Sequence, residues 1–383
     1  MRSLFAGLVA ALLFAAPAQA AVKTGPAGLA FYTPPKTLPK GTHGTPIWAR
    51  ALTGKAKLSS AKRNRLVLYR GQSGTAISGT VHVPKGKAPK GGWPVVSWAH
   101  GTIGGADVCA PSRVGMPVQY DHALLNAWLK AGYAVVRTDY EGLGTPGPHP
   151  YLVGASQGRA VLDIVRAARK LDRSLGTRVV LAGHSQGGHA ALWAGALANR
   201  WTPELKVRGT LALAPANHLG EQAGLLTALT TPGPLSGLAA LIVRGIDVSR
   251  PDLNVPALLS ERARALYPQV DEVCLGDLNQ PGSIGGLAPA DLFVPGADLA
   301  PVIAALNAND PETLKIRSGV VQIQQGRADT TVLSPFTDQL ATELKGNGAK
   351  VTYKTYPGVD HVGAVLDRAA ARDATKFVKA RLG

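Results

Sequence analysis

Apolar and polar residues alternate along the chain in blocks that are typical of a β-sheet covered by helices. After an extended, proline-rich start, two strand-like runs at 65–70 and 76–84 are separated by a turn rich in Gly and Ser. Short apolar runs then alternate with helical periodicity, giving expected strands at 94–100, 134–140, 178–184 and 209–216 and expected helices at 121–131, 155–171 and 186–199. This order predicts an α/β fold with a mostly parallel sheet and helices on both of its faces.

Between residues 217 and 313 the alternation lapses into segments rich in Gly, Pro, Leu and Ala, with short helical patches such as 260–267. It resumes with a strand at 319–326, a helix at 335–345, a strand at 351–358 and a long C-terminal helix. We interpret 217–313 as an insertion. Its apolar stretches, such as 225–243, fit a cap over a site, and an ordinary helical subdomain packed on the sheet is the alternative.

The N-terminal residues predict export. They contain a basic start at Arg2, an apolar run and then Ala18-Gln19-Ala20, the small-x-small pattern of a signal-peptidase site. Because the run is short for a membrane span and ends in proline and small residues, we favour a signal peptide cleaved after Ala20 over a membrane anchor, in a periplasmic or extracellular protein. The predicted division is a signal peptide at 1–20, an extended N-terminal segment at 21–60, a core at 61–216 and 314–383, and a cap or lid insertion at 217–313.

The number and spread of the charged residues argue against a nucleic-acid-binding protein. With 41 Lys and Arg against 24 Asp and Glu among 383 residues, the formal net charge is +17. These basic residues are spread thinly, and no helix-turn-helix, zinc-finger or RNA-binding aromatic motif accompanies them, so we expect no nucleic-acid partner. A basic exported protein attracted to lipid or other anionic surfaces is the better interpretation. No sequence feature specifies an oligomer, and we expect a monomer.

The pattern G-x-S-x-G, which marks a nucleophilic serine in some α/β enzymes, occurs twice, around Ser185 and around Ser156. Ser185 directly follows the expected strand 178–184 and opens a helix, as a strained strand-turn-helix requires. Ser156 instead follows a proline-rich stretch that cannot form a central strand, and it precedes a helix that it would cap. Ser185 is therefore the candidate nucleophile, and Ser156 is assigned a structural role.

A serine nucleophile needs a base, and the base needs an acid that holds its tautomer. In folds with this serine turn, the chain order is Ser, acid, His, with the acid after the seventh strand and the His after the eighth. Asp329 follows the expected strand 319–326 and His361 follows 351–358, which makes them the candidate acid and base. Asp360 is the rival acid, but a neighbour of the histidine is poorly placed to reach the back of its ring. None of the other histidines fits this order.

The oxyanion that forms in such a reaction needs preorganised N–H donors. We assign one to Gln186, directly after the candidate nucleophile, and the other to Thr102, whose hydroxyl is a further possible donor, in the loop after the strand 94–100. His100 is expected to brace this loop.

The G-x-G-x-x-G match at 142–147 is followed by prolines where a phosphate-binding helix should begin. Since no Cys/His cluster has metal-ligand spacing and no P-loop is present, we expect no cofactor and no metal.

The sequence has two cysteines, Cys109 and Cys274. An even pair in an exported chain predicts one disulfide, and two buried free thiols are the alternative. Cys109 lies just after the Thr102 loop, and Cys274 lies in the insertion. A bridge between them would hold the insertion near the candidate site.

Several segments, taken together, resemble the secretory lipase family, the α/β-hydrolases typified by fungal lipase A and shared with secreted bacterial triacylglycerol lipases. They are FYTPP near the mature start, HGTIGGADVCAPS from 100, DYEGLGTPGPHPYLVGASQGRAVLD from 139, GHSQGGHAALWA from 183, and GRADTTV followed by GVDH. They occur in the family order over most of the mature chain. The resemblance implies the α/β-hydrolase fold, the triad Ser185, Asp329 and His361, a lid after 216, and acyl-ester substrates.

The sequence therefore predicts a secreted serine ester hydrolase, either a triacylglycerol lipase or a carboxylesterase. The same triad in the same fold can act on peptides or on cell-wall and plant polyesters, because the fold does not fix the acyl donor. A hypothesis from another class is a non-catalytic surface-binding protein with a vestigial triad. The intact order of the three residues argues against it.

Overall fold

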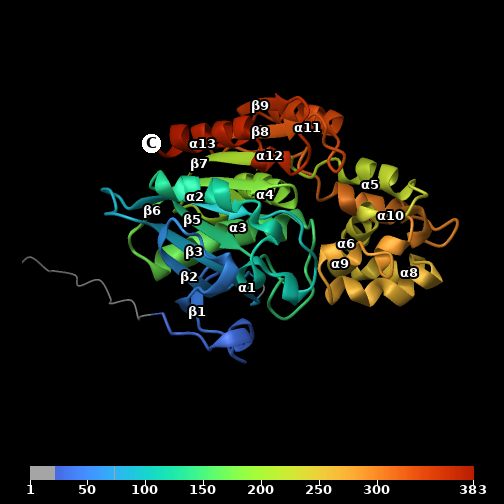
Figure 1. The fold of residues 1–383 in the computed structure, drawn as a ribbon, viewed down its shortest axis with the longest axis horizontal. Helices are drawn as coiled ribbons and strands as arrows, with labels where there is room; N and C mark the ends of the chain where they lie inside the picture. The colour runs from blue at the N-terminus through green and yellow to red at the C-terminus, as the bar shows by residue number, and fades with distance from the viewer. Residues whose placement is uncertain (1–21, 73) are drawn as a thin grey trace, which may run out of the picture.

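A nine-stranded sheet forms the centre of the molecule, with the strands in the order β1-β2-β3-β5-β4-β6-β7-β8-β9 (Figure 1). The structure is a computed structural model that describes residues 22–72 and 74–383, so the predicted signal peptide at 1–20 lies outside the described residues. The strands are β1 (Pro46–Ala51), β2 (Ala61–Arg70), β3 (Ala76–Pro84), β4 (Trp93–Ala99), β5 (Ala134–Thr138), β6 (Leu175–His184), β7 (Lys206–Leu213), β8 (Val320–Gly326) and β9 (Val351–Tyr356).

Most of this sheet is parallel. Strands β5, β4, β6, β7, β8 and β9 pair in parallel, whereas β1, β2 and β3 pair antiparallel with one another and β3 pairs antiparallel with β5. Helices connect the parallel strands, as the crossover between parallel neighbours requires. The predicted fold class, a mostly parallel sheet with helices, is confirmed.

Alternate side chains of the central strands point into two cores, one on each face of the sheet. Every residue of β4 is buried; Val95 packs in the core that contains α3 and α4, and its neighbour Val96 in the core that contains α2 and α13. The helices are α1 (Pro111–Val114), α2 (His122–Lys130), α3 (Gly154–Leu171), α4 (Gln186–Trp201), α5 (Leu219–Thr227), α6 (Pro234–Ser249), α7 (Val255–Leu258), α8 (Glu261–Leu266), α9 (Leu275–Leu278), α10 (Ala300–Asn307), α11 (Ser334–Gly346), α12 (Gly363–Leu366) and α13 (Arg368–Leu382). Burial on both faces explains why the central strands are continuous apolar runs in the sequence.

Strand β1 is an edge strand that the sequence pattern does not predict. Ile47 and Ala49 are buried, whereas Trp48 and Arg50 are partly exposed, so β1 alternates as a half-buried strand does. It is short, and it begins with Pro46 at the end of the proline-rich segment, a position where a sheet tolerates proline. Because β1 adds one strand, the seventh and eighth strands of the prediction are β8 and β9.

The six helices from α5 to α10 connect β7 to β8 and gather at one end of the sheet, on the right in Figure 1; we call residues 217–313 the helical block. Their apolar side chains form a core of their own, which also takes in Tyr151 and Leu152 from the loop between β5 and α3. The block therefore packs on a loop of the sheet domain. Across 22–72 and 74–383, no helix is long and apolar enough to cross a membrane.

Candidate active site

Ser185 occupies a sharp turn between the end of β6 and the start of α4. Its φ of 57° and ψ of −121° lie in a region that non-glycine residues rarely adopt. A Cβ at Gly183 would lie 2.1 Å from the carbonyl oxygen of Gly187, and one at Gly187 would lie 1.9 Å from that of Ala99. Only glycine fits at these two positions, so the local sequence is suited to this strained strand-turn-helix.

The structure brings Ser185 together with His361 and Asp329. His361 lies in the loop after β9, and its Nε2 is 2.9 Å from Ser185 Oγ. Asp329 lies in the loop after β8, and its Oδ2 is 2.7 Å from His361 Nδ1. The carboxyl ends of parallel strands lie at the same edge of the sheet, which is why these loops meet although the residues are far apart in sequence.

Asp329 is held by several hydrogen bonds. Its Oδ1 accepts from the N–H groups of Thr331 (2.8 Å) and Val332 (2.9 Å), and its Oδ2 accepts from Gln325 Nε2 (2.9 Å) and His361. Burial alone would raise the pKa of Asp329, but the hydrogen bond and charge of His361 and the two N–H groups together hold it below its ordinary value. Asp329 is thus a fixed carboxylate behind the imidazole.

His184 supports His361 from the side of the serine turn. Its Nε2 donates to the backbone carbonyl of His361 (2.9 Å), and the two rings lie 4.7 Å apart. Burial lowers the pKa of His184 to about 3, so the ring is neutral and its Nδ1 accepts from the hydroxyl of Tyr120 (3.3 Å). The rival acid Asp360 instead accepts from the N–H of Gly363 (2.7 Å) at the start of α12.

Gln186 is the first residue of α4, so its N–H has no acceptor one turn earlier in the helix. Its side-chain amide donates to Nε2 of His149 (3.0 Å), whose Nδ1 donates to the carbonyl of Glu141 (2.8 Å). Burial lowers the pKa of His149 to about 4, which keeps Nε2 free to accept. Sequence order gave no reason to select His149. The fold brings it to Gln186 because the loop after β5 folds back over the serine turn.

Thr102 lies in the loop after β4, as predicted, and its hydroxyl is 2.6 Å from the hydroxyl of Tyr151. His100 is fully buried in the same loop, where its Nδ1 donates to the carbonyl of Gly101 (2.7 Å) and its own carbonyl accepts from the hydroxyl of Tyr140 (2.9 Å). Burial lowers the pKa of His100 to about 3. These contacts agree with a bracing residue rather than with a group that exchanges protons near neutral pH.

Ser156 does not cap α3, and that prediction is wrong. The helix begins earlier, at Gly154, and Ser156 lies in its first turn with its hydroxyl donating to Glu141 Oε2 (2.9 Å). The N–H of Gly154 donates to the side chain of Asn309 (3.0 Å), which comes from the helical block. The capping group is distant in sequence, and so the local pattern could not reveal it.

The predicted disulfide between Cys109 and Cys274 is present, with Cα atoms 5.5 Å apart, and free thiols are excluded. Backbone contacts reinforce it: Gly104 pairs with Cys274 as an isolated bridge, and the N–H of Leu275 donates to the carbonyl of Ile103 (2.9 Å). The loop that carries Thr102 is therefore attached directly to the helical block.

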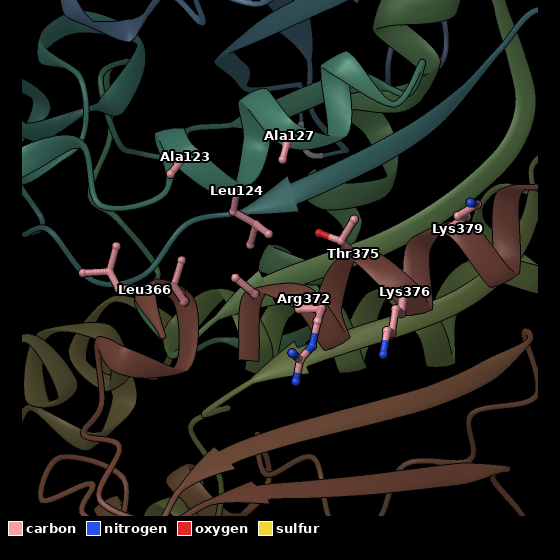
Figure 2. Close-up of a pocket in the computed structure, with 10 residues that line it drawn as sticks. Ala123, Leu124, Ala127, Leu366, Arg372, Thr375, Lys376 and Lys379 are labelled. Carbon is pink, nitrogen blue, oxygen red and sulfur yellow. The ribbon is translucent and has the colours of Figure 1, made fainter. Parts of the chain in front are cut away.

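A groove of about 400 Å³ lies between α2 and α13 (Figure 2). Its apolar lining includes Leu124, Val365 and Leu366, and α13 contributes Arg372, Lys376 and Lys379 as a basic edge. Ser185, Asp329 and His361 do not line this groove, although α12, which contributes Leu366, follows the loop of His361.

Residues 109–280 match the model of the secretory lipase family. The chain is thus similar to the secretory lipases, as its motifs predict. The matched segment contains Ser185 and both cysteines and ends before Asp329 and His361.

Individual lipases are similar to this chain in sequence, and an esterase structure is similar to it in fold. Lipase A of Moesziomyces aphidis is 30% identical over 39% of this chain and 32% of its own length. A probable inactive lipase of Mycobacterium tuberculosis is 27% identical over 74% of this chain and 65% of its own length. The chain thus covers less than two thirds of each of these relatives. The crystal structure of a rice cell wall degrading esterase from Xanthomonas oryzae superposes with a TM-score of 0.74 at 19% identity, over 89% of this chain and 100% of that one.

Proposed function

We propose that this protein is an exported carboxylic ester hydrolase in which Ser185, His361 and Asp329 form a catalytic triad. The observation that carries the proposal is the continuous hydrogen-bonded chain from Asp329 through His361 to Ser185. The strained turn at Ser185 and the similarity to the secretory lipases support the same class of reaction.

In the proposed reaction, Ser185 Oγ attacks the ester carbonyl while His361 Nε2 takes its proton. Asp329 holds the tautomer of His361 and stabilises the imidazolium. The N–H groups of Gln186 and Thr102 bind the oxyanion, and His149 and the disulfide hold these donors in place. His361 then protonates the leaving alcohol, which yields an acyl-enzyme. Water, activated by the same histidine, releases the acid and restores the serine.

We further propose that the helical block is a lid and that the substrates are acyl lipids. The attachment of the block to the Thr102 loop through Cys109 and Cys274 supports this, because any movement of the block is then anchored at one edge of the site. A lid that opens at an oil surface gives a rate that rises abruptly when the substrate exceeds its solubility limit. A rate that stays proportional to substrate across that limit would contradict the lid.

The leading alternative keeps the triad and changes the ester. The esterase of Xanthomonas oryzae, whose fold is similar over its whole length, is described as degrading rice cell walls, which favours polymeric cell-wall or plant esters as the second candidate class. A peptidase would cleave amides at least as fast as esters. One relative is described as a probable inactive lipase, so a non-catalytic, surface-binding protein is the third hypothesis to test.

Export and surface contact are part of the proposal. The secretory lipase similarity and the disulfide support an exported protein, and a mature N-terminus at Ala21, read by mass spectrometry, would test the predicted cleavage. The basic edge of α13 and the apolar groove beside it favour transient adsorption to anionic lipid surfaces. Co-sedimentation with anionic and with neutral vesicles measures this, and equal binding to both would argue against the role of charge.

The deciding experiment compares hydrolysis of p-nitrophenyl esters, from acetate to palmitate, by the wild type, Ser185→Ala and Ser156→Ala. We expect Ser185→Ala to lower kcat by at least about 10⁴-fold and Ser156→Ala to retain most of it. A fluorophosphonate probe should label Ser185. Unlabelled Ser185 would favour the non-catalytic hypothesis, and wild-type rates in Ser185→Ala would refute the proposed nucleophile. The acyl length at the rate maximum distinguishes a lipase from a short-chain esterase.

The pH profile gives an independent test. His361 must be neutral to accept the proton of Ser185, so we expect kcat/KM to rise with pH. A rate that is flat from about pH 5 to 9 would contradict a histidine base.

A further inference from the structure

His218, Glu312 and Glu343 meet at the point where the helical block joins the sheet. His218 directly precedes α5, Glu312 lies between α10 and β8, and Glu343 lies on α11. His218 Nε2 is 3.4 Å from Glu343 Oε1 and 3.7 Å from Glu312 Oε2. One possible ligand atom of each residue lies within 4.8 Å of the other two. None of the three belongs to the proposed triad.

The imidazole of His218 is fixed by a residue beside it. The amide of Asn217 donates to the carbonyl of Pro215 (2.7 Å) and is 3.2 Å from the hydroxyl of Thr337, which turns its Oδ1 toward His218 Nδ1 (2.8 Å). Nδ1 therefore carries a hydrogen, and in the neutral ring the lone pair of Nε2 faces the two glutamates. Metal-binding histidines are oriented by such a hydrogen bond from their other nitrogen.

Each of three carboxylates near His218 has one oxygen without a hydrogen-bond partner. Within the described residues, Glu312 Oε2, Glu343 Oε2 and Asp310 Oδ1 are buried atoms without one. Two carboxylates thus face one imidazole, and a bound cation would offset their negative charge.

We propose that His218, Glu312 and Glu343 bind one zinc ion, with water as the fourth ligand. Zinc bonds of about 2.0–2.2 Å in a tetrahedral site place two ligand atoms about 3.3–3.6 Å apart, close to the two distances measured from His218 Nε2. An imidazole with two carboxylates suits zinc, whereas calcium and magnesium prefer oxygen ligands alone. Glu312 and Glu343 keep 26% and 41% of their side-chain surface exposed, which leaves a path for the ion.

The position of the site indicates a structural role. The ion would link three parts of the chain. They are the start of the helical block at His218, the segment from the block to β8 at Glu312, and α11 of the sheet domain at Glu343. Both connections of the block would then be fastened to one helix. We therefore expect zinc to stabilise the block on the sheet and to leave the chemistry at Ser185 to the triad. The sequence expectation of no metal relied on local Cys/His spacing, which cannot detect ligands from three distant segments.

The test is a calorimetric titration of chelator-treated protein with zinc chloride alone at neutral pH. We expect one ion per chain, and a dissociation constant at least about tenfold higher in Glu312→Gln and in Glu343→Gln. Glu272→Gln, an exposed glutamate elsewhere in the helical block, is the matched control and should bind zinc as the wild type does. At a zinc concentration about a hundredfold above the dissociation constant, Tm should rise by about 4 °C in the wild type and the control only.

Each other outcome overturns the proposal. Tight binding that survives both glutamine substitutions would place zinc elsewhere, for instance at His361. Absence of binding, together with Tm values that zinc does not change, would leave His218 as the partner of two glutamates in an ordinary ion pair. Crystals soaked in zinc give a separate answer, because the anomalous signal must lie between the three side chains. These readouts do not depend on ester hydrolysis, so failure of the proposed function would not affect them.

Discussion

The Asp329→Asn substitution tests the proposed triad sharply, because it replaces one carboxylate oxygen by an amide nitrogen and keeps the shape of the side chain. The N–H groups of Thr331 and Val332 both donate to Oδ1, so the asparagine must keep its oxygen there. Its NH₂ group then replaces Oδ2, facing His361 Nδ1 at 2.7 Å and Gln325 Nε2 at 2.9 Å. Nδ1 of His361 must become an acceptor, which moves the ring hydrogen to Nε2.

With a hydrogen on Nε2, His361 donates to Ser185 and can no longer take its proton. Loss of the correct tautomer lowers kcat by about 10⁴-fold in serine triads, which corresponds to about 5 kcal/mol of transition-state stabilisation. Initial rates on a p-nitrophenyl ester, with thermal unfolding measured beside them to verify the fold, provide the assay. A folded Asp329→Asn protein within about tenfold of the wild-type kcat would refute the assignment of Asp329 as the acid.

Asp360→Asn is the matched control. Asp360 is adjacent to His361, and its Oδ1 accepts from the N–H of Gly363 (2.7 Å), a bond that an asparagine oxygen also makes. We expect nearly unchanged kcat. A large loss in Asp360→Asn with little loss in Asp329→Asn would exchange the roles of the two carboxylates.

Three further predictions concern stability. Replacing both Cys109 and Cys274 by Ser removes a link between residues 165 positions apart. In the chain-entropy model this lowers the free energy of unfolding by up to about 5 kcal/mol. An unchanged urea midpoint would show that the backbone pairing beside the bridge is enough to hold the two segments together. Gly187→Ala places a Cβ 1.9 Å from the carbonyl oxygen of Ala99 and should abolish soluble folded protein. Gly224→Ala in α5 is the control, because no atom lies within 4 Å of the added Cβ, and it should be neutral or stabilising. Equal yields of soluble protein from the two variants would contradict the close packing at Gly187. Burial lowers the pKa of four histidines to between about 3 and 4, namely His100, His149, His184 and His189. The unfolded chain binds more protons at these residues between about pH 6.5 and 4, so the free energy of unfolding should fall as pH falls through that window, by at most about 1.4 kcal/mol per histidine per pH unit; identical urea unfolding at pH 7 and 5 would contradict this.

Sequence patterns predicted most of the sheet, because buried parallel strands are continuous apolar runs whose identity does not depend on distant partners. The pattern failed at β1, a strand of six residues of which only two are buried, directly after a proline-rich segment. It also failed at the start of α3, because Asn309, far away in the sequence, bonds to Gly154 and no local residue caps the helix.

The candidate site divides in the same way. The turn at Ser185 is encoded by its flanking glycines, and the order of Ser185, Asp329 and His361 follows from their places after successive strands. His149 and His184 gave no comparable signal. Each of them matters because of a hydrogen-bond partner that is distant in sequence. The partner of His149 is the side chain of Gln186, and the partner of His184 is the backbone carbonyl of His361.

The sequence by itself determined the alternation of strands and helices, the strained serine turn, the order of the triad candidates and the availability of two cysteines for one bond. All of these depend on local residue properties or on order along the chain. Tertiary structure alone decided which side chains meet across that order: the support of Gln186 by His149, the attachment of the helical block to the Thr102 loop, and the approach of Glu312 and Glu343 to His218. Such contacts depend on how separate elements pack in three dimensions, and a linear pattern does not contain their distances.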